Sequence, residues 1–488
     1  MHKSREYNFA GRLVQRLGEN SCLIDASTGE TIPGRDVPRL IVGYAAKFLS
    51  AGLQPGDRIV IGCELRPATA LAYLGAVYAG LAPVPVDEQR LANSGAAVAE
   101  KAGAKAIWAR KESHRALSSD DSVMCLHGEA SGQQTGLREP AAVTLDDIAV
   151  LMPTSGSTGA PRLVMVTHGN LIANTEAIVR SQDLGKDERA MLIMPLSYCF
   201  GASVMHTHLY QGGGVVFDAR FMFPDKVLRA IALYECTSFA GVPTVYNVLL
   251  RRSNVRTLPL GSLRRLLQAG GSLAPESIRE MREILPRAEF FAMYGQTEAT
   301  ARIACLAARR FPEEIGSAGA PLDNVTIRIA DENGHEVGKG EAGEIQVQGP
   351  SVCAGYAGDT EATAAKFREG WLSTGDFGCM DEAGFLWVKG RGDDFVKMRG
   401  VRVGMGEVEA RVAGVAGVCE CAAKRVQHPE AGEALALFIV ADGSPDGVLQ
   451  RVRRALPAHW TCASIDFVPE LPKTENGKIA RSQLGAMA

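Results

Sequence analysis

The sequence predicts an α/β fold in which parallel strands alternate with helices. Some segments show apolar residues at helical spacing, and short β-branched runs lie between them, separated by Gly- and Pro-containing turns. The chain has 488 residues, 46% hydrophobic and 22% charged, which is enough for two or three domains with large cores. Because parallel strands need helical crossovers, this alternation implies sheets covered on both faces.

The alternation is clearest near the amino terminus. Helical spacing over residues 37–53 predicts a helix, and a Gly/Pro turn then leads to a strand over residues 58–63. Residues 67–80 predict a second helix, residues 82–86 a second strand and residues 101–108 a third.

The pattern changes further along the chain. Residues 118–140 are rich in Ser, Gly and Asp and predict an exposed connection before a strand over residues 148–153. Residues 326–348 predict a small β-rich unit with a hairpin turn at residues 331–334. From Asp393 onward strands and helices mix again.

Charge and composition exclude some classes of protein. Lys plus Arg total 52 against 55 Asp plus Glu, and this net charge of −3 gives no field that attracts nucleic acid or anionic membrane. The polar amino terminus lacks the apolar core of a signal peptide, and no later run is long enough to cross a bilayer. We therefore expect a cytoplasmic protein without nucleic-acid or membrane partners. The eleven cysteines form no CxxC pair and are expected to be reduced.

Hydroxyls and glycines are concentrated in one turn after the strand predicted over residues 148–153. Glycine lets the backbone approach a polyanion, and Ser and Thr hydroxyls donate hydrogen bonds to phosphate oxygens. The turn is a candidate phosphate cradle, although it lacks the Lys-Ser or Lys-Thr of a Walker A loop. By composition alone it is also typical of an ordinary loop. Its residues are Thr154, Ser155, Gly156, Ser157, Thr158 and Gly159, with Arg162 following.

Three further segments carry groups suited to a nucleotide. In Met-Tyr-Gly-Gln-Thr-Glu, Tyr294 can stack on a purine, Thr297 can bind phosphate and Glu298 can hold magnesium. Asp376 ends a Ser-Thr-Gly-Asp turn and could accept ribose hydroxyls, while Arg391 could reach phosphate or ribose. Taken singly, these segments are also typical of strand-end turns and polar hairpin loops.

The last motif, Pro-Lys-Thr-Glu-Asn-Gly-Lys, ends at Lys478. Its Asn-Gly pair forces a tight turn that would present this lysine at the tip. A lysine near a carboxy terminus is by itself usually a solvated side chain.

In this order and together, the five motifs resemble the adenylate-forming superfamily of acyl- and aryl-CoA synthetases, nonribosomal-peptide adenylation domains and beetle luciferases. The resemblance implies an amino-terminal domain, residues 1–392, of parallel sheets and helices with a small β-barrel. It also implies a small, mobile α+β carboxy-terminal domain, residues 393–488, with Asp393 as the hinge and Lys478 as the catalytic lysine. The active site would lie between the two domains.

The resemblance also implies roles for individual residues. Residues 154–159 would wrap the β- and γ-phosphates of ATP, and Lys478 would bridge the substrate carboxylate and the α-phosphate. Thr297 would touch the α-phosphate and Glu298 would hold Mg²⁺. The rest of the nucleotide site would be Gly270, Gly271, Ser272, Tyr294 and Gly295 near the adenine, with Asp376 and Arg391 near the ribose.

The reaction implied is activation of a small carboxylic acid to an acyl adenylate, with pyrophosphate released, followed by transfer to a thiol. That thiol would belong to CoA or to the phosphopantetheine of an acyl or peptidyl carrier protein, which would be a separate protein because the sequence ends ten residues after Lys478. Two alternatives are a stand-alone amino-acid-activating ligase and a non-catalytic nucleotide-binding homologue. Arg162 keeps the second open, because the family usually has lysine there.

The acyl pocket is expected around residues 195–201. Amino-acid-activating members of the family usually carry aspartate where this chain has Tyr198, and no acid lies between Pro195 and Tyr210. An ammonium group buried without a carboxylate would be costly. The sequence therefore favours a fatty or aryl acid over an α-amino acid. The expected pocket residues are Tyr198, Phe200, Gly201, Val242 and Met293.

Lys478→Ala should abolish adenylate formation and leave thioester formation from supplied acyl adenylate nearly intact. The lysine charge is useful where the carboxylate meets the α-phosphate and has little to do once the adenylate exists. Both half-reactions are measured on one preparation, and equal loss in both contradicts the assignment.

Asp393→Pro should have the opposite effect, with the first half-reaction retained and the second lost. Proline fixes one backbone dihedral and removes a donor, which restricts the hinge without touching the lysine. Pyrophosphate exchange should stay within a few-fold of wild type, roughly 1 kcal/mol of barrier, while thioester formation collapses. Undiminished transfer would rule out Asp393 as the hinge.

Overall fold

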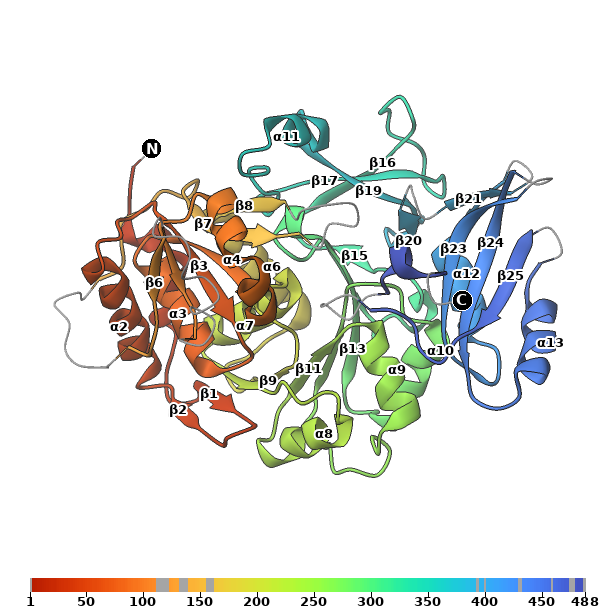
Figure 1. Cartoon of the computed structure of the whole chain (residues 1–488), viewed down its shortest axis with the longest axis horizontal. Helices are drawn as coiled ribbons and strands as arrows, with labels where there is room; N and C mark the ends of the chain where they lie inside the picture. The colour runs from red at the N-terminus through yellow and green to blue at the C-terminus, as the bar shows by residue number, and fades with distance from the viewer. Residues whose placement is uncertain are drawn as a thin grey trace.

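The computed structural model describes residues 2–110, 123–130, 139–154, 162–391, 395–398, 401–428, 432–457, 460–473 and 479–485. Its described part is a mixed α/β structure with parallel sheets in the larger, amino-terminal part and a smaller carboxy-terminal unit, drawn in blue in Figure 1. No described helix is both long enough and apolar enough to cross a bilayer.

The first sheet has four parallel strands in the order β4-β3-β5-β6. Helix α3 is buried along its whole length, as expected of a helix that is apolar on all sides. The predicted bounds of β3 are confirmed, and those of α2, α3 and β4 agree with the structure to within three residues. The elements are α2 (Val37–Ser50), β3 (Arg58–Cys63), α3 (Pro67–Tyr78), β4 (Ala82–Asp87), α4 (Glu88–Ala102), β5 (Ala106–Trp108) and β6 (Met124–Leu126).

Two predictions for this sheet were wrong in detail. The strand expected from residue 101 begins only at Ala106, because residues 101 and 102 end helix α4, which closes on Gly103 with φ of 59°. The connection expected over residues 118–140 contains the edge strand β6, whose three residues are too few to show an alternating pattern.

The main sheet has nine strands in the order β15-β14-β13-β12-β11-β9-β10-β1-β2. The strands from β13 to β1 are parallel, and β14, β15 and β2 are antiparallel additions at the edges. The strands are β1 (Cys22–Asp25), β2 (Thr31–Pro33), β9 (Arg189–Leu192), β10 (Gly214–Phe217), β11 (Ser238–Gly241), β12 (Arg265–Gln268), β13 (Glu289–Tyr294), β14 (Ala304–Ala307) and β15 (Ala320–Pro321).

Helices pack against the strands of the main sheet and against each other. Helix α7 contacts β9 and β10, α9 contacts β11, and α10 contacts β13, while α1 lies against α3, α6 and α7. These helices are α1 (Phe9–Val14), α6 (His168–Gln182), α7 (Cys199–Tyr210), α8 (Pro224–Leu233), α9 (Pro243–Arg252) and α10 (Pro275–Ile284).

Antiparallel pairs complete the larger part. The strand predicted over residues 148–153 is confirmed as β7 (Ile148–Pro153), which pairs with β8 (Leu163–Thr167). The predicted β-rich unit is a five-stranded antiparallel sheet that is open between β16 and β20 in the described residues. It contains β16 (Thr326–Ala330), β17 (Gly343–Gln348), β18 (Phe367–Arg368), β19 (Trp371–Met380) and β20 (Leu386–Arg391), with helix α11 (Thr360–Lys366) beside it.

The carboxy-terminal unit has its own hydrophobic core, which includes Val396, Val408, Leu437 and Val452. Its helix α12 contacts β20, and its strand β23 contacts α9 of the larger part. The unit contains β21 (Phe395–Met398), β22 (Val401–Gly404), α12 (Met405–Ala413), β23 (Val418–His428), β24 (Gly432–Ala441), α13 (Pro445–Ala455) and β25 (Cys462–Phe467).

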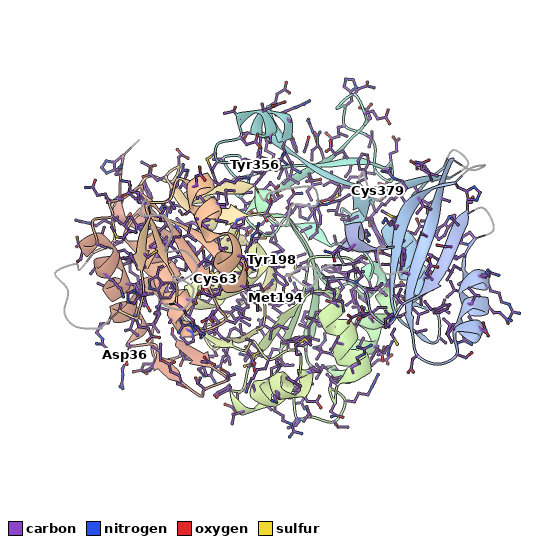
Figure 2. All side chains as sticks on the ribbon, viewed as in Figure 1. Asp36, Cys63, Met194, Tyr198, Tyr356 and Cys379 are labelled. Carbon is purple, nitrogen blue, oxygen red and sulfur yellow. The ribbon has the colours of Figure 1, made fainter. Side chains whose placement is uncertain are left out.

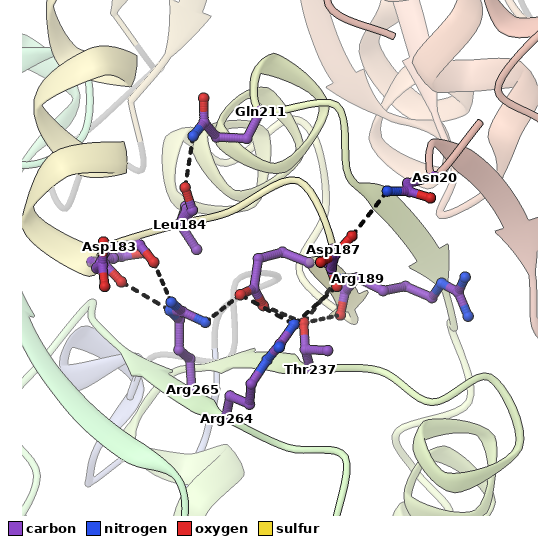
Figure 3. A network of polar contacts seen from close by, with 11 residues as sticks. Asn20, Asp183, Leu184, Asp187, Arg189, Gln211, Thr237, Arg264 and Arg265 are labelled. Atoms are coloured by element: carbon purple, nitrogen blue, oxygen red, sulfur yellow. Dashed lines mark hydrogen bonds and ion pairs between the residues drawn. The ribbon is translucent and has the colours of Figure 1, made fainter. Parts of the chain in front are cut away.

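A buried ionic network joins the strands of the main sheet beside β9. The Glu188 carboxylate accepts hydrogen bonds from Arg265 Nη1 and Thr237 Oγ1, both at 2.5 Å, and lies 3.3 Å from Arg264 Nη2. Figure 3 shows Arg264, Arg265 and Thr237 converging there. The Glu188 side chain is 5% exposed, so its loss would leave a cation without its partner in a buried place.

Glu188→Gln should therefore destabilise the chain by about 3 kcal/mol. The matched control is Glu276→Gln, whose carboxylate is 68% exposed and pairs with Arg279 at 3.4 Å, and which should cost no more than about 0.5 kcal/mol. Urea unfolding of both variants beside the wild type measures this. Equal shifts would show that the buried network contributes no more than a surface pair.

Candidate active site

The expected site residues gather at one edge of the main sheet. Strands β9, β11, β12 and β13 run parallel, so their carboxyl ends meet at the same edge, where α/β sheets bind their ligands. Tyr198, Phe200 and Gly201 follow β9, Val242 follows β11, Gly270, Gly271 and Ser272 follow β12, and the residues from Met293 to Glu298 lie at the end of β13.

The turn after β13 is built around a required glycine. A Cβ on Gly295 would lie 1.8 Å from the carbonyl oxygen of Ala301, so a side chain cannot fit there. Thr300 holds φ of 68°, which is strained for a non-glycine residue, and its hydroxyl donates to the Ser351 carbonyl at 2.6 Å. The tight turn fixes Tyr294 and Glu298 on either side of its glycine.

Asp376 is the centre of one polar cluster. Its carboxylate accepts hydrogen bonds from the Tyr294 hydroxyl at 2.6 Å and from Arg391 Nε at 3.1 Å. Asp376 in β19 and Arg391 in β20 are directly opposite each other in the five-stranded sheet. Gln296 Nε2 lies 3.5 Å from the same carboxylate. Burial and the Asp376 charge raise the pKa of Tyr294 well above its ordinary value, so its hydroxyl remains a donor. The held carboxylate fits a partner with vicinal hydroxyls, such as a ribose.

Glu298 is the centre of the second cluster. Its carboxylate accepts a hydrogen bond from Tyr356 at 2.6 Å. The Arg162 guanidinium lies over the Tyr356 ring at 5.4 Å and pairs with Asp359 at 3.1 Å. Burial, with the charge of Glu298, raises the pKa of Tyr356, so the phenol stays protonated and holds the carboxylate in place. One held carboxylate fits Mg²⁺, which takes one or two protein carboxylates beside phosphate oxygens and water.

The expected phosphate turn begins and ends beside this second cluster. The Thr154 amide donates to the Arg162 carbonyl at 2.9 Å, and the Arg162 amide donates to Thr154 Oγ1 at 3.2 Å, so the two ends of the turn are held together. Ser155, Gly156, Ser157, Thr158 and Gly159 lie outside the described residues, as do Asp393 and Lys478.

Thr297 connects the two clusters to the expected acyl pocket. Its hydroxyl donates to the Cys199 sulfur at 3.5 Å, and the Cys353 thiol donates to its carbonyl at 3.4 Å. Burial raises the pKa of Cys353 to about 12, so this thiol is neutral. Cys199 is the first residue of α7, next to Tyr198, so the hydroxyl of Thr297 lies at the boundary with the pocket.

The pocket residues lie on α7 and β13, and Figure 2 shows Tyr198 near the middle of the molecule. The Tyr198 and Phe200 rings meet edge to face at 6.3 Å, and burial raises the pKa of Tyr198. A Cβ on Gly201 would lie 2.3 Å from the Pro195 carbonyl oxygen. Val242 is buried at the start of α9.

The residues expected near the adenine form a glycine turn directly after β12. Gly270 has φ of 87°, and the Gln268 side chain donates to the Gly271 carbonyl at 2.8 Å, which stabilises the turn through Ser272.

Two residues that contact the expected site residues, Tyr356 and Asp359, could not be recognised from the sequence. Tyr356 and Asp359 lie about sixty residues beyond Glu298, and their only local signal is a Gly-Tyr-Ala-Gly-Asp segment typical of a turn. Arg302 follows the YGQTE motif closely, and a charge within an otherwise small and apolar run was a usable signal. Its guanidinium lies over the Phe200 ring at 5.2 Å, so a cation lies beside one of the expected pocket residues.

Known proteins are similar to this chain over most of its length. The sequence profile of the AMP-binding enzyme family matches residues 12–357, and that of the AMP-binding enzyme C-terminal domain matches residues 407–478. Feruloyl-CoA synthase from Amycolatopsis sp is 34% identical over 473 residues, which cover 93% of this chain and 94% of that protein. The 2-succinylbenzoate–CoA ligase of Bacillus licheniformis is 34% identical over 350 residues, 71% of each chain. The crystal structure of ATP-bound MatB from Rhodopseudomonas palustris has a TM-score of 0.89 at 26% identity, covering 99% of this chain and 98% of its own.

Tyr356→Phe should weaken the response to magnesium, because Glu298 loses the hydrogen bond that orients it. Loss of about 1 kcal/mol corresponds to about a fivefold rise in the Mg²⁺ concentration that gives half-maximal stabilisation by ATP. Thermal unfolding with ATP present and Mg²⁺ titrated measures this. Tyr234→Phe, at the end of α8, is the control, and an unchanged Mg²⁺ midpoint for Tyr356→Phe would contradict the assignment of Glu298.

Proposed function

The chain belongs to the AMP-binding enzyme family, and we propose that it is an AMP-forming ligase that converts a carboxylic acid to an acyl adenylate and then to a thioester of CoA. The observation that carries this proposal is the pair of held carboxylates, Asp376 and Glu298, on either side of the glycine turn after β13. One carboxylate suits a ribose and the other suits a metal ion, which together describe a site for Mg·ATP.

In the bound state, Asp376 accepts hydrogen bonds from the ribose hydroxyls, and Tyr294 keeps that carboxylate in position. Arg391 neutralises the Asp376 charge and is 58% exposed on its side chain, so it can also reach a phosphate or the ribose. Gly270, Gly271 and Ser272 border the adenine, and residues 154–159 with Arg162 hold the β- and γ-phosphates. Gly295 lets the turn after β13 pass close to the Ala301 backbone, where no side chain would fit.

In the first half-reaction, a carboxylate oxygen of the acid forms a bond to the α-phosphorus while the bond to pyrophosphate breaks. Two anions must meet, so the barrier falls if fixed donors neutralise the charge that develops. Thr297 donates to the α-phosphate, and Lys478 bridges that phosphate and the carboxylate. Mg²⁺ held by Glu298 supplies further positive charge at the phosphates.

In the second half-reaction, the thiol sulfur bonds to the acyl carbon and AMP leaves with the bonding electron pair. The thiol arm needs a path to a carbonyl that Lys478 covers in the first step. The proposed mechanism therefore has the carboxy-terminal unit rotate about Asp393 between the two steps. The separate hydrophobic core of that unit supports its movement as one body.

The acid class follows from the pocket. The Tyr198 hydroxyl stays neutral, and the positive charges of Arg302 and Arg391 act on it. An α-ammonium group would meet like charge there and no partner, so α-amino acids are excluded. The relatives named for feruloyl-CoA and 2-succinylbenzoate favour an aryl acid within the fatty or aryl class.

The test is ATP–pyrophosphate exchange with fatty, aryl and α-amino acids, followed by AMP release on addition of CoA or of a phosphopantetheinyl carrier protein. We expect exchange with aryl or fatty acids, none with amino acids, and thioester formation with CoA. Exchange with an amino acid alone would overturn the pocket assignment, and transfer to the carrier alone would replace CoA as acceptor. Nucleotide binding with no exchange for any acid would identify a non-catalytic homologue instead.

A further inference from the structure

Arg302 is a cation buried without a countercharge. Its side chain is among the largest fully buried ones of the described residues, with 2% of the residue exposed. It forms no ion pair in the described part of the chain, and its Nε, also buried, has no hydrogen-bond partner. Among the described residues, its guanidinium contacts the Met293 sulfur and the face of the Phe200 ring.

These contacts do not compensate the charge. A thioether sulfur is a weak acceptor, and a desolvated cation over an aromatic ring gains about 2 kcal/mol. Removing a cation from water costs several kcal/mol. Burial lowers the pKa of Arg302, while arginine remains protonated in proteins.

The titratable neighbours of Arg302 supply no anion. Cys305, Cys199 and Tyr198, two thiols and a phenol, are the titratable groups whose charges act on Arg302, and burial raises the pKa of Cys305 to about 11 and that of Tyr198 further. Cys305 and Tyr198 are therefore neutral at physiological pH, and no ion pair among the described residues supplies the anion.

The position of Arg302 is fixed toward the acyl pocket. Asn174 holds its backbone on both sides, donating to its carbonyl at 2.8 Å and accepting from its amide at 3.3 Å. The guanidinium then lies among Phe200, Met293 and Tyr198, the residues that line the pocket of the proposed enzyme. A cation held in place by other contacts is organised in advance for a ligand.

We propose that Arg302 binds a second carboxylate of the acid substrate, so that the enzyme activates dicarboxylic acids. This rests on the proposed function. One carboxylate reacts beside Thr297, and the other pairs with the guanidinium, whose parallel N–H groups match a carboxylate in a bidentate arrangement. An acid with only one carboxylate leaves the cation buried and unpaired, so the site discriminates against it.

The test compares acids that differ only by the second carboxylate: hexanoate with adipate, octanoate with suberate, benzoate with terephthalate, and cinnamate with 4-carboxycinnamate. The kcat/KM of pyrophosphate exchange is measured for each. In the pair that gives the fastest exchange, we expect the dicarboxylate to be preferred by about 100-fold, which is the discrimination of a buried charged contact. Arg302→Met should remove this preference, while Arg180→Met, at an exposed pair with Asp323, should keep it.

Thermal unfolding of the ligand-free protein gives a second readout. Arg302→Met replaces an unpaired buried cation with an apolar chain and should raise the unfolding temperature, whereas a merely structural arginine would lower it on removal. A lower unfolding temperature with an unchanged dicarboxylate preference would overturn the proposal.

The two proposals fail in different ways. Exchange that is equal or faster with the monocarboxylates would overturn the role of Arg302 and leave the ligase intact. Absence of exchange with every acid would overturn the proposed function, and the dicarboxylate proposal with it.

Discussion

The hydrogen bond from the Tyr294 hydroxyl to the Asp376 carboxylate joins two sheets that are otherwise connected through a backbone bridge between Gly319 and Leu386. Tyr294 ends β13 of the parallel sheet, and Asp376 lies in β19 of the antiparallel sheet. The contact is partly buried, and Asp376 also pairs with Arg391, so the carboxylate is fixed from both sides. Parallel strands supply the edge at which ligands bind, and this bond brings the second sheet to that edge.

The two arginines of the site differ in environment, and the difference accounts for their separate roles. Arg391 is 58% exposed on its side chain and has a carboxylate at 3.1 Å, so its charge is both hydrated and paired. Arg302 is 2% exposed and forms no ion pair among the described residues. A surface pair of the first kind contributes little to stability, whereas a buried charge of the second kind destabilises the chain until a ligand neutralises it. Such a residue is expected where function, and not folding, determines its presence.

Local patterns were sufficient for much of the fold. The strands at residues 58–63 and 148–153 were predicted at their observed bounds, because each is a short apolar run between turn signals. Helix α4 was missed because its sequence is mostly small and polar, with too few large apolar residues to mark a buried face. The five-stranded unit was recognised from its turn, but its strand order depends on pairings between distant segments.

In the site too, residues within a local motif were predicted, and residues defined by contacts between distant segments were not. Sequence motifs identified Tyr294, Glu298 and Asp376 because each belongs to a compact segment with a recognisable chemistry. Tyr356 was not identifiable, because its role is defined by a contact across 58 residues of chain. Arg302 was close to a motif, yet only the structure shows that its guanidinium is buried with no anion paired to it among the described residues. A sequence gives the charge of a side chain, and only packing shows whether that charge is paired.

The proposed reaction imposes a constraint that a single rigid site cannot meet, because the same carbonyl must first be covered and then be open to the thiol. Asp376 and Glu298 are held by Tyr294 and Tyr356 within the larger part, so the nucleotide and the metal ion can keep one position through both steps. A rigid ribose and metal site with a movable lysine satisfies both half-reactions, because the adenylate stays in place while the group that covers it leaves. The carboxy-terminal unit packs around its own core, so its movement need not disturb these contacts.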